Sequence, residues 1–295
     1  SLYFHIPFCK TLCWFCGCTK IINKKQEPAV EYIKILEQEI DQYIATMQPG
    51  RKVQQLHFGG GSPNFLAPEL IDSFSDFLHD RFEFTDDAEM SAELDPRPVS
   101  LAHILAFRRL GVNRVSFGVQ DTQLSTQKAV NRVQTDEQNQ NAIDWSRAAG
   151  IHSLNIDLIY GLPHQTPESI KKTIEQILEY DPDRLAVFSY AHVPWVAPAQ
   201  KILERHGLPE PEEKIKMLGV IIELLTSNGY QYIGMDHFAK TTDTLAIAQR
   251  EKTMQRNFQG YSTFKDLEIC AFGMSSISQT SDTYRQNFKE LKDYS

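Results

Sequence analysis

Short β-type runs alternate with helical stretches along most of this 295-residue chain, and the alternation restricts its possible folds more than any other feature. The runs expected to form strands are LYFHI, QQLHFG, EMSAEL, RVSFGV, SLNIDLIY, RLAVFSYAH and YQYIGMDHF. The stretches expected to form helices are 30–47, 68–82, 101–110, 136–149, 167–180 and 212–227. Such alternation is typical of βαβ units around a parallel sheet. Six or seven units in about 240 residues favour a barrel, complete or partial, over two small domains.

Polar, glycine or cysteine residues follow each of the first six predicted strands. In chain order these strands end in PFC, GGGSP, ELDP, VQD, DLIYGLP and YAHVP. The carboxyl ends of parallel strands meet at one edge of a sheet, where ligands bind in parallel α/β folds. A single end of this kind is most simply a βα turn. Six of them, one rich in cysteine, favour one site at this rim.

Charge and hydropathy exclude several classes of protein. The formal net charge is −8 and no block of Lys or Arg occurs, which argues against a nucleic-acid partner. No apolar run approaches the roughly 20 residues needed to span a bilayer, and no secretory signal is recognisable. We therefore expect a cytoplasmic protein with reduced thiols and no membrane partner.

Four of the five cysteines lie in one short stretch, CKTLCWFCGC. Thiolates this close are expected to bind metal, and two kinds of site compete. Zinc would take all four as tetrahedral ligands, but structural zinc sites usually pair two separated Cys-x2-Cys knuckles. The spacing Cys-x3-Cys-x2-Cys on one loop favours a [4Fe–4S] cluster held by Cys9, Cys13 and Cys16, with the fourth iron left open. Cys270, in apolar sequence, is expected to be a core residue.

The cysteine loop, with Phe15 directly before the third cysteine, resembles that of the radical S-adenosylmethionine (SAM) enzymes. Longer motifs, among them LHFGGGSP, AELDPR, NIDLIYGLPHQTPES, GMDHFA and RNFQGY, resemble the oxygen-independent coproporphyrinogen III oxidases of bacterial haem synthesis. The resemblance covers essentially the whole chain. It implies an α/β fold of the (β/α)6 partial TIM-barrel type with a C-terminal extension.

The resemblance also implies the chemistry. The expected reaction is an anaerobic oxidative decarboxylation that turns two propionates of coproporphyrinogen III into vinyl groups, giving protoporphyrinogen IX. A 5′-deoxyadenosyl radical from a [4Fe–4S] cluster and SAM would start it. Two SAM molecules are expected per chain, together with an unidentified electron donor and a monomeric state.

Site residues follow from matching the family's pattern onto this chain. Cys9, Cys13 and Cys16 are the expected cluster ligands, and Cys18 is expected to be needed for catalysis without binding the cluster. The first SAM is expected to contact Tyr3, Gly60, Glu93 and Ile277. The second is expected to contact Phe15, Gly61, Ser62, Gln120, Arg132, Asp157 and Ala191. Ser62 stands where the pattern usually has Thr.

Plainer interpretations of these residues stay open. Glu93 suits an exposed turn, Arg132 a surface ion pair, and Cys18 a fourth zinc ligand. Asp236 and His237 are expected at the end of the seventh strand and, like His192, carry no predicted role. The substrate's four carboxylates call for cations, and the candidates by proximity to motifs are Lys10, Lys20, Arg250 and Arg256.

Three other functions compete with the decarboxylation. A haem chaperone of the same branch normally lacks the last cysteine, so Cys18 argues against it. A radical SAM methyltransferase is disfavoured by the GMDHFA and RNFQGY motifs. A zinc-binding interaction module is the alternative that is not an enzyme.

Two segments are expected along the chain. Residues 1–240 form the partial barrel with the cluster loop at 9–18, and residues 241–295 extend it toward a C-terminal domain that is missing or incomplete. The chain opens just before a strand-like run and stops in helical-looking sequence, FKELKDYS, so it is expected to be a fragment.

Overall fold

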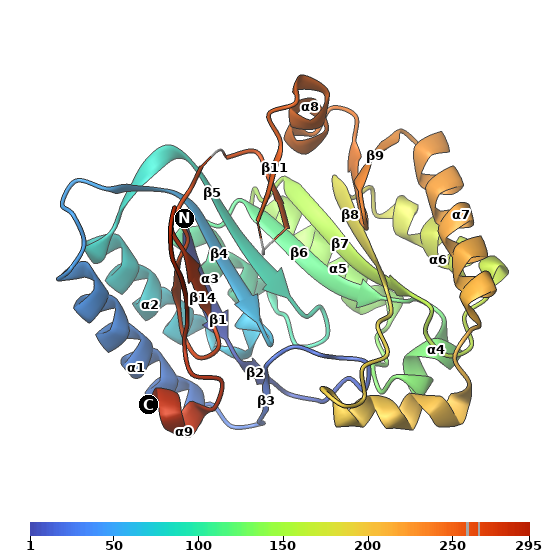
Figure 1. Cartoon of the computed structure of the whole chain (residues 1–295), viewed down its shortest axis with the longest axis horizontal. Helices are drawn as coiled ribbons and strands as arrows, with labels where there is room; N and C mark the ends of the chain where they lie inside the picture. The colour runs from blue at the N-terminus through green and yellow to red at the C-terminus, as the bar shows by residue number, and fades with distance from the viewer. Residues whose placement is uncertain (258–259, 265) are drawn as a thin grey trace.

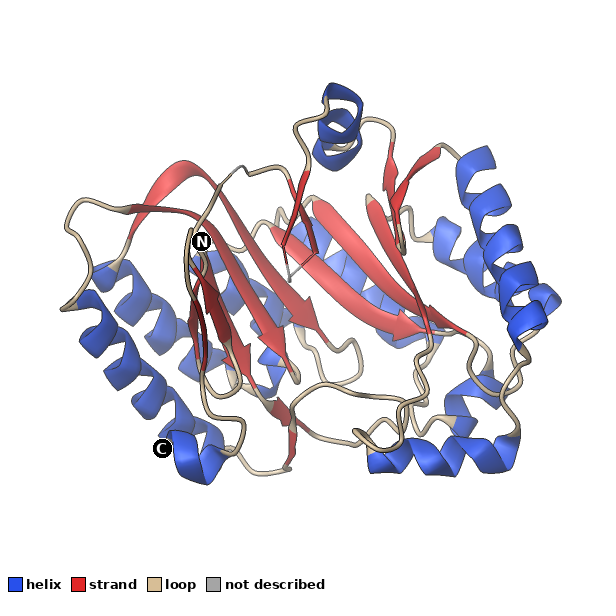
Figure 2. Ribbon diagram, viewed as in Figure 1, coloured by secondary structure: helices blue, strands red, loops and turns tan. Residues whose placement is uncertain are grey.

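A curved nine-stranded sheet forms the centre of the computed structural model, which describes residues 1–257, 260–264 and 266–295 (Figures 1 and 2). The strands lie in the spatial order β13 (Cys270–Phe272), β1 (Leu2–Ile6), β4 (Lys52–Gly60), β5 (Glu83–Leu94), β6 (Arg114–Gln120), β7 (Ser153–Tyr160), β8 (Arg184–Ser189), β10 (His237–Lys240) and β9 (Tyr230–Gly234). All pairs from β13 to β8 are parallel, and β10 pairs antiparallel with both β8 and β9. The two edges are different strands, so the barrel is open.

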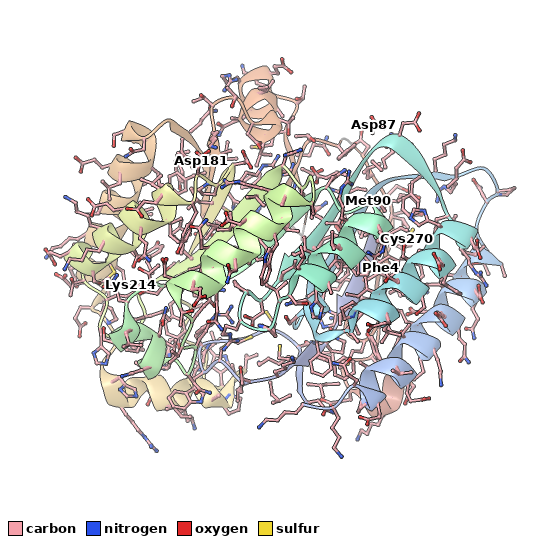
Figure 3. The ribbon with its side chains drawn as sticks, turned by 180° about the vertical axis from the view of Figure 1, so that it is seen from behind. Phe4, Asp87, Met90, Asp181, Lys214 and Cys270 are labelled. Carbon is pink, nitrogen blue, oxygen red and sulfur yellow. The ribbon has the colours of Figure 1, made fainter. Side chains whose placement is uncertain are left out.

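Helices cover the outer face of the sheet, as the view from behind shows (Figure 3). The long ones are α1 (Glu27–Ile44), α2 (Pro68–Arg81), α3 (Leu101–Leu110), α5 (Asp136–Ala148), α6 (Pro167–Glu179) and α7 (Pro211–Ser227). Shorter helical elements are η1 (Pro63–Phe65), α4 (Leu124–Ala129), η2 (Pro198–His206), α8 (Thr244–Glu251) and α9 (Leu291–Tyr294). Short strand pairs complete the described fold: β2 (Phe8–Cys9) with β3 (Ile21–Ile22), β11 (Gln255–Asn257) with β12 (Gly260–Ser262), and β14 (Ile277–Gln279) with β15 (Tyr284–Gln286). The predicted partial-barrel fold is confirmed. Within the described ranges, no helix has the length and apolarity needed to cross a lipid bilayer.

Local sequence signals place the ends of the helices. Ser100 and Thr166 each accept a hydrogen bond from the third residue of the helix that follows, and so cap α3 and α6. Gly111 ends α3 with φ of 114°, a left-handed conformation that favours glycine. α3 and α6 thus begin and end within one residue of their predicted bounds, whereas α1 lies three residues before the predicted range 30–47.

The hydrophobic core lies between the sheet and the outer helices. Phe4 on β1 is fully buried, and its ring packs against Phe58, Phe74 and Phe272 with centroids 5.1–5.6 Å apart. Along β6 and β7, buried and partly exposed residues alternate strictly. Because side chains alternate across a strand, one half of these residues packs on the helices and the other half faces the barrel interior. This alternation supplies the inward-facing polar groups of the site.

Two expectations about the strands are wrong. The run YQYIGMDHF is not one strand but the hairpin β9–β10, which turns at Met235 and Asp236 because Met235 adopts φ of 49°. Asp236 therefore lies in a turn, and His237 begins a strand. The second miss is β13: Cys270 is buried as expected, but it also pairs with β1 as part of the main sheet.

Residues beyond 240 contribute to the barrel itself, since β13 comes from this segment. The boundary at 240 and the missing C-terminal domain stay predictions. Phe258 and Gln259 of the RNFQGY motif lie outside the described residues. Figure 1 shows β11 and α8 at the end of the sheet opposite to β2 and β3, which flank the cysteine loop.

Candidate active site

One pocket of about 460 Å³ occupies the barrel interior. The cysteine loop closes it at the carboxyl ends of the strands, and residues of β10, α8, β11 and β12 line it at the other end. Eleven of the fifteen predicted site residues line this pocket. They are Cys9, Cys13, Phe15, Cys16, Cys18, Gly60, Gly61, Glu93, Gln120, Arg132 and Asp157.

The other four predicted residues do not line the pocket. The Tyr3 hydroxyl lies 3.2 Å from His5 Nδ1. A Cβ on Gly59 would contact both this hydroxyl and Glu93, so Tyr3 lies beside these two residues. Ser62 is buried, and its hydroxyl donates to Asn64 Oδ1 at 2.8 Å. The carbonyl of Ala191 accepts from Gln200 Nε2, and Ile277 pairs with Gln286 in the β14–β15 hairpin. Their contacts with SAM stay predictions.

Distant parts of the chain hold the cysteine loop in place. Trp14 N donates to the carbonyl of Val130 at 3.0 Å, and Asn131 Nδ2 donates to the carbonyl of Leu12 at 2.8 Å. On the far side, Gln200 Nε2 donates to the carbonyl of Phe15 at 2.8 Å. These hydrogen bonds fix the backbone of a loop that has no regular structure. A loop that carries the ligands of a cluster needs such a fixed backbone.

A buried ion-pair network lies beside the loop. Asp95, at the end of β5, pairs with Arg97 at 2.6 Å and with Arg132 at 3.3 Å. Both guanidiniums also donate to Cys13 Sγ, at 3.5 and 3.4 Å. Burial alone would raise the pKa of Asp95, but the two guanidiniums outweigh it and hold that pKa at about 2. Arg132 is thus not a surface ion pair but part of this network.

The residues fit a cluster bound through thiolates. Cys9, Cys13 and Cys16 are free thiols lining one pocket, and the guanidiniums of Arg97 and Arg132 both donate to Cys13 Sγ. Lys20 adds a further positive charge, held by its bonds to the carbonyls of Cys16 and Cys18. In the described ranges, no three His, Cys, Asp or Glu side chains converge as one metal ion requires.

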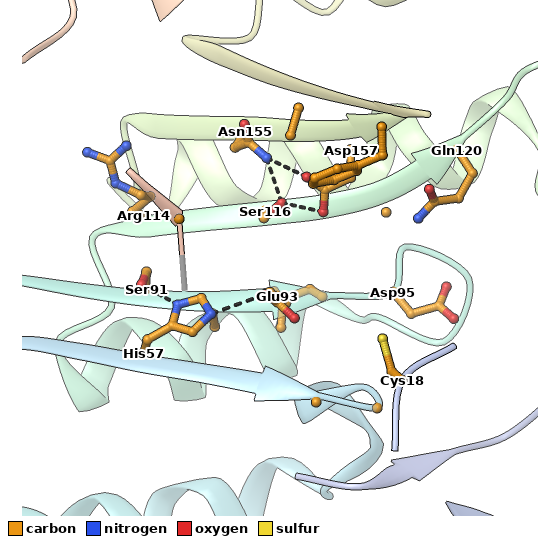
Figure 4. Close-up of a pocket in the computed structure, with 18 of the residues that line it drawn as sticks. Cys18, His57, Ser91, Glu93, Asp95, Arg114, Ser116, Gln120, Asn155 and Asp157 are labelled. Carbon is orange, nitrogen blue, oxygen red and sulfur yellow. Dashed lines mark hydrogen bonds and ion pairs between the residues drawn. The ribbon is translucent and has the colours of Figure 1, made fainter. Parts of the chain in front are cut away.

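Glu93, on β5, is held toward the pocket by a chain of hydrogen bonds (Figure 4). His57 Nε2 lies 3.1 Å from Glu93 Oε1, and His57 Nδ1 lies 2.7 Å from Ser91 Oγ. Desolvation alone would raise the pKa of Glu93. The hydrogen bond from His57 and that from the amide of Gly60 outweigh this effect, so the pKa of Glu93 is lowered. The result is an ionised acceptor facing the pocket, as the predicted contact with ribose hydroxyls requires.

Asp157, on β7, lies across the pocket from Glu93. Ser116 Oγ donates to one of its oxygens at 2.8 Å, and Asn155 Nδ2 donates to the other at 2.7 Å. Burial raises the pKa of Asp157 to about 7, with a further contribution from the charge of Glu93. Gln120, at the end of β6, adopts φ of 72°, and its side-chain amide lies against Gly118.

The chain's own packing explains two of the rim glycines. A Cβ on Gly61 would approach the carbonyl of Pro7 to 2.6 Å, and one on Gly60 would approach the His5 ring to 2.8 Å. The GGGSP turn therefore presses against the strand that leads into Cys9. This close approach requires glycine with or without a ligand.

Several lining residues were missed by the sequence analysis. Asp95 and Arg97 stand in the quoted AELDPR motif, so only their role was missed. His57, Arg114 and Arg184 lie toward the interior or the start of strands, where the rim pattern gives no signal.

The predicted cations fare differently. Of Lys10, Lys20, Arg250 and Arg256, Lys20 lines the pocket, while Arg250 bonds to Gln231 on β9. His237 is a lining residue, whereas His192 bonds with Tyr190 and Glu204.

Comparison with known proteins identifies the family of this chain. A family model described as the radical SAM superfamily matches residues 3–177. The oxygen-independent coproporphyrinogen III oxidase of Escherichia coli is 48% identical over 294 residues, which is 100% of this chain and 64% of that protein. The enzyme of that name from Synechocystis is 46% identical over 99% of this chain and 63% of its own length.

A solved structure gives the same relationship. Coproporphyrinogen III oxidase from E. coli, described as a radical SAM enzyme, superimposes with a TM-score of 0.96 at 48% identity, covering 99% of this chain and 67% of that one. The chain spans slightly less than two thirds of the length of the curated relatives named above. Since the family model covers more than half of the residues, including the cysteine loop, the chain belongs to the radical SAM superfamily.

Proposed function

We propose that this protein catalyses the oxygen-independent conversion of two propionates of coproporphyrinogen III into vinyl groups, giving protoporphyrinogen IX in porphyrin and haem biosynthesis. One observation carries the proposal: the interior pocket is lined by the cysteine loop at the carboxyl ends of the strands and by polar and charged side chains toward their amino ends, so groups suited to a cofactor and to a polyanionic substrate face one space. The names of the similar proteins support the choice of substrate.

Membership of the superfamily implies a [4Fe–4S] cluster and SAM, which when bound supply a 5′-deoxyadenosyl radical. Cys9, Cys13 and Cys16 would hold the cluster. Two SAM molecules are proposed, the first on the Glu93 side and the second on the side of Arg132 and Asp157. Cys18, on the same loop but exposed, is proposed to act in turnover without binding iron.

The substrate change can be written so that atoms balance. A hydrogen atom leaves the propionate carbon next to the one that bears the carboxylate, since the double bond must form between these two carbons. The bond to the carboxylate then breaks, carbon dioxide departs, and one electron passes to an acceptor. An external electron donor is required to start each turnover, and its identity is open.

The protein's part is to position and to shield. Asp95 holds the guanidiniums of Arg97 and Arg132 over Cys13, and His57 holds Glu93, so the polar groups are set before any ligand arrives. The enclosing barrel keeps water and stray hydrogen donors from a reactive intermediate. A monomeric state and a cytoplasmic location are part of the same proposal.

Anaerobic turnover tests the proposal. The chain, with reconstituted cluster, is incubated with SAM, a reductant and coproporphyrinogen III, and the oxidised porphyrins are separated by liquid chromatography with mass detection. Vinyl products, each lighter by one carbon dioxide and two hydrogens per converted side chain, are expected from the wild type. The Cys16→Ala variant should lose cluster and product together. Cluster formation and SAM cleavage without vinyl product, by a protein of the relatives' full length, would contradict the assigned reaction.

A further inference from the structure

The end of the pocket farthest from the cysteine loop carries cations that the cofactor site does not use. Five Lys and Arg side chains line the pocket: Lys20, Arg97, Arg132, Arg114 and Arg184. The first three are engaged with the cysteine loop and Asp95. The other two, Arg114 at the start of β6 and Arg184 at the start of β8, lie toward the amino ends of the strands, and Figure 4 shows Arg114 at the end of the close-up away from Cys18.

The hydrogen bonds of Arg184 connect two elements of the fold. Its Nε and Nη2 lie 2.9 and 2.8 Å from Asp243 Oδ1, and Nη2 also donates to Thr244 Oγ1 at 3.1 Å. These bonds attach the start of α8 to β8, so the ion pair of Arg184 is explained without a ligand.

Arg114 is only partly explained in this way. Its Nη2 pairs with Glu89 Oε2 at 2.9 Å, but its Nε and Nη1 are buried and have no hydrogen-bond acceptor among the described residues. The buried Nδ1 of His237, on β10, is likewise without a partner in the described part of the chain. Buried polar groups are normally paired, and an unpaired one costs about 1–3 kcal/mol. Arg114 and His237 thus each keep unmet hydrogen-bonding capacity within the described part of the chain.

The strand register places Arg114 on β6 and His237 on β10, with β7 and β8 between them. Arg114 is opposite Ser153, Asn155 is opposite Arg184, and Ala186 is opposite His237, so the side chains descend across neighbouring strands. Phe188 and Tyr261 both meet the His237 ring edge-on, with centroids 5.9 and 5.2 Å away. The pocket wall therefore carries a guanidinium on β6 and, two strands beyond β7, aromatic rings around His237 on β10, which are groups that suit a large ring system bearing carboxylates.

We propose that Arg114 binds the carboxylate of a propionate that the reaction leaves unchanged, and so anchors the substrate at the end of the pocket opposite to the cysteine loop. This subsite rests on the proposed function, which supplies a substrate with four propionates of which two react. The end of the pocket at the cysteine loop would then hold the cofactors and the reacting propionate. The opposite end would hold the unreactive propionate, and so set how far the reacting propionate lies from the cofactors.

Ligand binding without turnover tests the subsite. The probe is mesoporphyrinogen IX, which keeps the two propionates retained in the product and has ethyl groups where the reactive propionates would be. Its dimethyl ester is the matched ligand without carboxylates. Both are measured by anaerobic equilibrium dialysis, in one detergent buffer, against the chain with reconstituted cluster and SAM. Arg109→Gln, which removes an exposed arginine paired with Asp72 on the outer surface, is the control variant.

We expect the Arg114 variants to lose affinity for the free acid and not for the ester. Arg114→Gln should weaken binding of the free acid at least about tenfold, because a charge-assisted contact is lost, and change binding of the ester less than about threefold. Arg114→Lys, which keeps the charge but not the forked geometry, should weaken the free acid by only about threefold. Arg109→Gln should change neither ligand.

Two outcomes would overturn the subsite: equal loss for acid and ester, which would mean that Arg114 acts through the fold, or no loss for either. If Arg114→Gln does not fold, the test uses Arg114→Lys instead. A ratio of free-acid affinity to ester affinity equal to that of the wild type would then refute the subsite. Wild-type protein that binds neither probe would instead contradict the proposed function, and the subsite would fall with it.

Discussion

Replacement of Asp157 by Asn should stabilise the cofactor-free protein at alkaline pH. The pKa of this carboxyl is raised to about 7, first by burial and then by the charge of Glu93. The folded chain therefore holds a proton on Asp157 more tightly than the unfolded chain, where the ordinary value is 3.8. The ionised carboxylate consequently destabilises the fold in full above pH 7, and this cost declines as the pH falls toward 4.

The size of the effect follows from the shift. One pKa unit corresponds to about 1.4 kcal/mol, so the charged form costs about 4 kcal/mol of unfolding free energy at pH 8 and about 2 kcal/mol at pH 5. The amide keeps only one acceptor oxygen for the bonds from Ser116 and Asn155, which removes about 1–2 kcal/mol at either pH. Asp157→Asn should thus gain about 2 kcal/mol at pH 8 and almost nothing at pH 5.

Urea unfolding of both proteins at the two pH values is the assay. The gain at pH 8 minus the gain at pH 5 is the decisive quantity, because the lost hydrogen bond cancels from it, and it should be about 3 kcal/mol. Asp76→Asn, an exposed position on α2, is the control and should show no such difference. A gain independent of pH, or a loss at pH 8, would refute the raised pKa. On the proposed binding of a second SAM at this carboxylate, the same variant should bind SAM more weakly, because the amide lacks the negative charge.

Three further predictions concern the rest of the site. Asp95→Asn leaves two guanidiniums without their carboxylate, and loss of one partner of a buried pair should lower the unfolding free energy by about 3 kcal/mol, measured by urea unfolding at pH 7. His57→Phe keeps the ring that stacks on Tyr3 but removes both bonds that orient Glu93, so equilibrium dialysis should show about tenfold weaker binding of SAM at unchanged iron content. Cys18→Ala should retain iron and sulfide yet form no vinyl product, and loss of its iron would make Cys18 a ligand.

Sequence periodicity predicts the barrel units because the pattern of apolar and polar residues in each strand and helix depends on which of its faces is buried. Alternation along RVSFGVQ separates the residues that pack on helices from those that face the interior, and helix caps such as Thr166 mark boundaries within a few residues. The rim residues share the pocket for the same reason, since parallel strands bring their carboxyl ends together. The hairpin β9–β10 was not predicted because the run YQYIGMDHF resembles one continuous strand, although Gly234 and Met235 both adopt positive φ where the chain turns.

Features that depend on register or on distant partners were not predictable. The bond between His57 and Glu93 exists because β4 and β5 pair with His57 opposite Ser91, which local sequence does not encode. Strand β13 has only three residues, too short for a periodic signal. Arg114 was missed because it opens a strand, whereas the rim pattern marks only strand ends.

The most direct test of the proposed reaction follows one hydrogen atom. Coproporphyrinogen III deuterated at the propionate carbons attached to the pyrrole rings is turned over anaerobically with SAM by the reconstituted chain, and the 5′-deoxyadenosine formed is examined by mass spectrometry. The proposal predicts that one deuterium enters 5′-deoxyadenosine for each vinyl group formed. Vinyl product accompanied by 5′-deoxyadenosine without deuterium would contradict it.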